Sequence, residues 1–86
     1  MEKISYQQLF VFLQSLGFEE YSTSPLDRIF EHPATETIVA FSMIGEGGDS
    51  AQVSRSDYLS VDVRLNQNGL IELPLKDSIR EFQEAR

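Results

Sequence analysis

The chain has 86 residues, a formal net charge of −7, one histidine and no cysteine. This length predicts one domain with a modest core, and 41% hydrophobic residues exclude a wholly disordered polypeptide. The missing cysteines exclude disulfides and thiolate zinc sites, and a single histidine excludes a multi-histidine metal site. The negative charge argues against broad electrostatic binding to nucleic acid or to anionic membranes. We therefore predict a single domain over residues 1–86, with neither a cofactor nor a metal ion.

The first predicted element is a helix over residues 6–16. Ser5 and Gln8 have the spacing of a capping box at its start. Leucine and phenylalanine residues then recur at helical intervals, and Gly17 is placed to end the helix.

Three short strands are predicted next, over residues 18–22, 26–31 and 36–43. Turn signals separate them, because Pro25 fixes φ in a turn and Pro33 disfavours helix at the residue before it. The third segment is rich in the β-branched and aromatic residues that suit a pleated surface. Short connections favour an antiparallel meander of the three strands.

The middle strand divides its side chains between two faces of the predicted sheet. Arg28 and Phe30 belong to one face, whereas Asp27 and Ile29 belong to the other. We expect Phe30 in the core and Asp27 at the surface, because burial of an unpaired carboxylate is costly. The face that helices leave uncovered is the predicted working surface, and it carries either Asp27 and Ile29 or Leu26, Arg28 and Phe30.

The second half of the chain begins with a glycine-rich loop over residues 44–52. The segment lacks the third glycine and the lysine of a phosphate-binding loop, so the loop, with residues 45–50 at its centre, is interpreted as a mobile connector. Ser54 then starts a second helix that ends before Gly69, and a third helix is predicted over residues 74–85. The predicted fold class is α+β, in α-β-β-β-α order, with a three-stranded antiparallel sheet packed on helices and a C-terminal third helix.

Candidate catalytic residues are few. His32 is the only histidine, and histidine is the side chain that ordinarily exchanges a proton near neutral pH. Its place before a proline at a strand end favours a role in a turn. The chain contains no nucleophile elbow, calcium loop or H-E-x-x-H sequence. The candidates therefore reduce to Asp27, Arg28 and His32.

Several short motifs follow one another in the order of the predicted elements: Tyr6-Gln7-Gln8-Leu9, Leu16-Gly17-Phe18, Ile29-Phe30, His32-Pro33, Ser54-Arg55-Ser56-Asp57-Tyr58-Leu59 and Asn68-Gly69-Leu70-Ile71. Together they resemble the HicA-like toxins. The resemblance implies a double-stranded-RNA-binding-domain-like fold and the activity of a small mRNA interferase. It covers about residues 5–71, and residues 72–86 resemble a helical extension of some longer relatives.

The resemblance breaks at the residues that carry the chemistry. The catalytic histidine of the family corresponds to Asp27, and the glycine and serine before it correspond to Pro25 and Leu26. RNA cleavage through the 2′-hydroxyl needs a group that gives or takes a proton near pH 7, and aspartate does this poorly. A carboxylate at this position would also repel the phosphate.

Three functions remain open on the sequence. The first is a catalytically degenerate HicA-like domain that acts as a protein-interaction or regulatory module, for which the resemblance implies a HicB-like antitoxin as partner. The second is an active mRNA interferase with a displaced site at His32 and Arg28. The third is an unrelated small α+β binding domain. The net negative charge argues against an RNA partner. We expect no membrane partner and a cytoplasmic location, because the sequence shows neither a signal peptide nor an apolar run of bilayer length.

Overall fold

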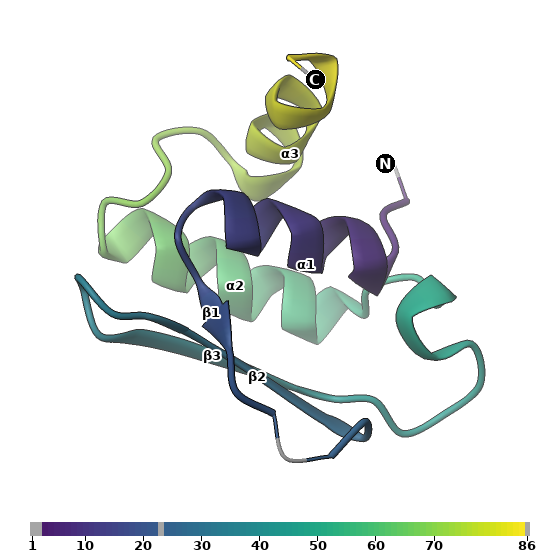
Figure 1. The fold of residues 1–86 in the computed structure, drawn as a ribbon. Coiled ribbons are helices and arrows are strands. Elements are labelled where there is room, and N and C mark those ends of the chain that lie inside the picture. The colour runs from purple at the N-terminus through teal and green to yellow at the C-terminus, as the bar shows by residue number, and fades with distance from the viewer. Residues whose placement is uncertain (1–2, 23, 86) are drawn as a thin grey trace.

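The computed structural model describes residues 3–22 and 24–85, which form an α+β fold around a three-stranded antiparallel sheet (Figure 1). The order of elements is the predicted one: a helix, three strands and two further helices, with the sheet order β1-β2-β3. The elements are α1 (Tyr6–Ser15), β1 (Glu19–Glu20), β2 (Asp27–His32), β3 (Thr37–Ser42), the 3-10 helix η1 (Gly48–Ser50), α2 (Arg55–Gln67) and α3 (Leu75–Glu84).

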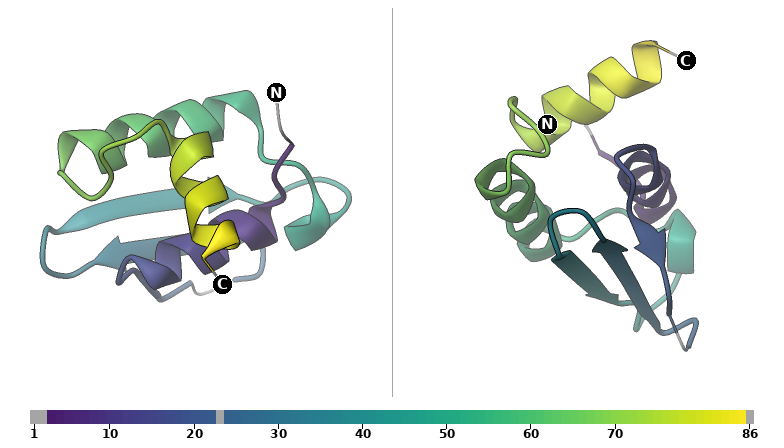
Figure 2. Two further views of the ribbon diagram at one scale, coloured as in Figure 1. Left: turned by 90° about the horizontal axis from the view of Figure 1, so that it is seen from above. Right: turned by 60° about the vertical axis from the view of Figure 1, so that its left-hand side comes forward.

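The elements form three layers (Figure 2). Helices α1 and α2 lie on the same face of the sheet, and α3 crosses over both of them on the side away from the strands. No helix of the described chain covers the other face of the sheet, which we call the open face. None of the helices in residues 3–22 and 24–85 has both the length and the hydropathy that a membrane span requires.

Both ends of α1 follow from the local sequence. The Ser5 hydroxyl accepts the Gln8 backbone N–H at 3.2 Å, and the Gln8 side-chain oxygen accepts the Ser5 N–H at 2.8 Å. The predicted capping box is therefore confirmed. After the helix, Gly17 has a φ of +103°, in the left-handed region that ends helices and favours glycine.

The first strand is shorter than predicted. The prediction covered residues 18–22, but β1 pairs with β2 over two residues only. Phe18 turns into the core before the strand begins. Beyond Tyr21, the Ser22 hydroxyl accepts the Ile29 N–H at 2.7 Å, so a side chain replaces the next backbone partner of β2. The other two strands agree with the prediction to within one residue at each end.

The core lies between the sheet and the helices. Phe10 of α1 packs on Phe30 of β2 and Phe41 of β3, with ring centroids 4.9 and 5.4 Å apart. Phe30 is fully buried, as expected. Helix α3 contributes Leu75 and Ile79 to the same hydrophobic cluster, so the C-terminal helix is part of this core.

Candidate functional site

The three candidate residues all lie on β2, but the structure does not bring them together. Strand alternation directs Asp27 to the open face, whereas Arg28 and His32 point to the face that the helices cover. His32 lies four positions after Arg28 on the strand, a separation of about 13 Å, and the buried Phe30 lies between them. A site that combines His32 with Arg28 is therefore not formed.

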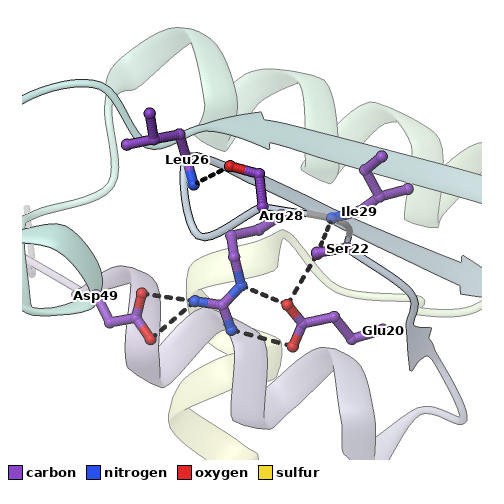
Figure 3. A network of polar contacts seen from close by, with 7 residues as sticks. Glu20, Ser22, Leu26, Arg28, Ile29 and Asp49 are labelled. Atoms are coloured by element: carbon purple, nitrogen blue, oxygen red, sulfur yellow. Dashed lines mark hydrogen bonds and ion pairs between the residues drawn. The ribbon is translucent and has the colours of Figure 1, made fainter.

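Arg28 is enclosed by two carboxylates (Figure 3). Its Nη1 donates to both oxygens of Asp49, at 2.8 and 3.0 Å, and its Nη2 donates to Oε1 of Glu20 at 3.0 Å. The Nε group donates to the other oxygen of Glu20. The guanidinium carbon also lies 4.7 Å from the centroid of the Phe10 ring, which adds a cation–π contact. Few donors of Arg28 remain for an incoming phosphate.

The electrostatics of this cluster are those of a structural ion pair. The hydrogen bond from Arg28 holds the pKa of Glu20 below its ordinary value, and the same hydrogen bond raises the pKa of Arg28. One guanidinium and two carboxylates leave a net negative charge, which disfavours an anionic ligand. Sequence reasoning missed Glu20 and Asp49 as partners, because a turn separates Glu20 from Arg28 and Asp49 lies in the glycine-rich loop, 21 residues from Arg28.

His32 connects the β2–β3 turn to the end of α1. Its Nε2 lies 3.0 Å from the Leu16 carbonyl oxygen, so this nitrogen carries the proton and donates it. Its Nδ1 then accepts from the Thr35 hydroxyl at 2.9 Å, and the Thr37 hydroxyl, 2.7 Å from that of Thr35, completes the chain of hydrogen bonds. Both ring nitrogens are occupied, which fits the predicted role of a turn residue.

The open face combines acidic and apolar side chains. Tyr21, which directly follows β1, forms an apolar stripe across this face with Ile29 of β2 and Ile38 of β3, and Tyr21 and Ile38 are 47% and 42% exposed. The strands contribute carboxylates and no lysine or arginine to this face. In register, the outward side chains are Glu19, Tyr21, Asp27, Ile29, Glu31, Ile38, Ala40 and Ser42.

Asp27 is exposed on this face, as expected, and it lies opposite Ser42. The described residues contain no group of three or more histidine, aspartate or glutamate side chains that could hold a metal ion.

Comparisons with protein-family models, with curated proteins and with solved structures gave no significant match. The function is therefore argued from the geometry of these surfaces.

Proposed function

We propose that this chain is a catalytically degenerate HicA-like domain that acts as a protein-interaction module through its open face. The observation that carries the proposal is the apolar stripe of Tyr21, Ile29 and Ile38, which is bordered by carboxylates on a sheet face that no described helix covers. Exposed apolar side chains rimmed by polar ones are typical of protein-binding surfaces.

The chemistry of the face defines the partner. Glu19 and Glu31 are direct cross-strand neighbours, and Asp27 lies farther along the same face. Like charges placed opposite each other disfavour the isolated sheet, whereas a basic partner would neutralise them. The partner is therefore a protein that presents lysine or arginine residues around an apolar centre. The resemblance to the HicA-like toxins identifies a HicB-like antitoxin as the candidate of this kind.

The geometry supports ribonuclease activity less well. Both ring nitrogens of His32 are engaged in hydrogen bonds within the fold, Arg28 is bound by Glu20 and Asp49, and Asp27 is an acid on a negatively charged face. General acid–base catalysis needs a group within hydrogen-bond reach of the reacting proton. RNA cleavage also needs a nearby cation that stabilises the negative charge on the phosphate. The displaced site at His32 and Arg28 does not offer this combination.

Titration of the chain with a purified HicB-like protein tests the proposal by calorimetry. We expect the double substitution Asp27→Lys and Glu31→Lys to weaken binding by about tenfold or more, because it reverses the charge of the face. Ile38→Ser should weaken binding through loss of apolar contact. The matched control is Leu59→Ser, since Leu59 is similarly exposed, at 46%, but lies on α2. Equal binding by all variants would contradict the proposal.

A metal-free RNA-degradation time course separates the interaction module from the interferase. The wild-type chain is expected to leave RNA intact. Cleavage that survives stringent purification and is lost in His32→Ala would instead establish the displaced site. An Asp27→His variant, assayed beside the wild type, shows whether the scaffold still holds RNA when the histidine of the resembled family is restored.

A further inference from the structure

The two edge strands of the sheet, β1 and β3, differ in length and in composition. The β1 edge is two residues long and consists of glutamates, which protects it from pairing with another strand. The β3 edge is six residues long, with the sequence Thr-Ile-Val-Ala-Phe-Ser. Its own sequence contains no charge, proline or glycine, which are residues that commonly block strand addition.

The hydrogen-bond phase of β3 shows which backbone groups face outward. The Met43 N–H donates to the Leu26 carbonyl at 2.7 Å. In an antiparallel ladder every second residue bonds to the same neighbouring strand, so Thr37, Val39 and Phe41 direct their backbone groups to β2. The N–H and C=O groups of Ile38, Ala40 and Ser42 therefore point away from β2. Of these groups, the Ile38 carbonyl has a partner in the described chain, the Nη1 of Arg64 at 2.8 Å.

A groove of about 260 Å³ runs between this edge and helix α2. Its two ends carry opposite charges. Asp57 is half-buried and accepts the Tyr6 hydroxyl at 2.5 Å, and Arg64 forms no ion pair within residues 3–22 and 24–85. The helical rise separates Asp57 from Arg64 by about 10 Å along α2. The lining residues are Ile38, Val39, Ala40, Phe41, Asp57, Ser60, Val61 and Arg64.

We propose that this groove binds an extended segment of a partner protein as a fourth, antiparallel strand next to β3. The outward groups of Ala40 and Ser42 supply main-chain hydrogen bonds, as in other cases of strand addition. Side chains on the helix-facing side of the bound segment supply specificity: a basic residue meets Asp57, and an acidic residue meets Arg64. This inference does not depend on the open face.

A second copy of the chain fits the groove less well. Each copy carries a net charge of −7, and each brings its own α2 beside the pairing edge. A single extended segment has neither obstacle, because it needs only the strand spacing of about 4.8 Å.

The test uses two synthetic peptides and the ¹⁵N-labelled chain. The first peptide, Thr-Lys-Val-Glu-Val-Glu-Thr, places its lysine beside Asp57 and its glutamates beside Arg64 when it is antiparallel to β3. The second, Thr-Glu-Val-Lys-Val-Lys-Thr, reverses these charges. We expect saturable shifts of the Ala40 and Ser42 amide signals with the first peptide, and binding about tenfold weaker with the second.

Two substitutions locate the contact. Arg64→Glu should reverse the preference between the peptides, whereas Arg55→Glu makes the same charge change at the start of the same helix and should leave it unchanged. Ala40→Pro removes one outward N–H without breaking a bond to β2, and it should abolish binding. Circular dichroism confirms that each variant is folded.

Several outcomes would overturn the inference. Absent shifts, equal binding of the two peptides, or shifts confined to Tyr21 and Ile29 would each exclude strand addition at β3. Shifts of the edge amides with protein concentration alone would identify a second copy as the occupant. None of these results depends on the open-face variants, so failure here is distinguishable from failure of the proposed function.

Discussion

Replacement of Arg28 by methionine tests whether the Arg28 cluster is structural. Arg28→Met keeps an unbranched side chain against Phe10 and removes the ion pairs to Glu20 and Asp49. The side chains of Arg28, Glu20 and Asp49 are 19%, 25% and 38% exposed, so solvent partly screens both pairs. Exposed pairs contribute about 0.2–1 kcal/mol and charged hydrogen bonds up to about 3 kcal/mol. With about 0.5 kcal/mol for the cation–π contact, the expected loss is about 2 kcal/mol in the free energy of unfolding.

The loss should depend on pH in a definite direction. Because Arg28 lowers the pKa of Glu20 in the folded chain, the stabilisation is fully present above the ordinary value of 4.5 and is lost as the pH falls through the lower, folded-state pKa. The difference in stability between wild type and Arg28→Met should therefore be constant near neutral pH. It should shrink once the pH falls below 4.5, as Glu20 becomes protonated.

Urea unfolding at several pH values measures this difference. At neutral pH the expected change corresponds to a decrease in Tm of about 8–16 °C for a domain of this size. Arg55→Met is the control, because it removes the same charge from an exposed residue that starts α2. Equal stability of the two variants, or a difference that grows as the pH falls, would refute the structural role of Arg28.

Two further substitutions test the contacts that join the elements. Tyr6→Phe removes the hydrogen bonds that link the Tyr6 hydroxyl to Asp57 and to the Ser54 N–H. Urea unfolding should show a loss of about 1–2 kcal/mol in the free energy of unfolding. The control Tyr21→Phe, on an exposed ring, should change that free energy by less than about 0.5 kcal/mol. Gly17→Ala places a methyl group at positive φ and 3.3 Å from Nε2 of His32. It should lower the Tm more than Gly69→Ala, where φ is also positive but no atom beyond the neighbouring residues lies within 4 Å of the added carbon. Equal effects of the two glycine substitutions would contradict the close packing of His32 on Gly17.

The sequence predicts the features that depend on neighbouring residues. The capping box of Ser5 and Gln8 and the cap at Ser54 act over three residues, so their spacing alone locates the starts of α1 and α2. Strand alternation over residues 26–31 places Phe30 and Asp27 on opposite faces, and the cost of burying a carboxylate then predicts that Phe30 is buried and Asp27 exposed.

Features that depend on tertiary register could not be predicted in the same way. Glu20 is eight residues from Arg28, and Asp49 is 21 residues from it. Their meeting requires the pairing of β1 with β2 and the return of the glycine-rich loop beside α1. The β3 edge likewise becomes visible only when the strand order is known, because the same residues in a central strand would have no free backbone groups.

Asp27 and Arg28 show how one peptide bond can separate two electrostatic environments. Their side chains lie on opposite faces of β2, and Arg28 is neutralised by Glu20 and Asp49 on the helix-covered side. The positive charge nearest to Asp27 in the sequence is therefore not available to the open face. A ligand that approaches this face meets carboxylates without a compensating cation from the strands, so the local field favours a basic protein surface over a phosphate backbone.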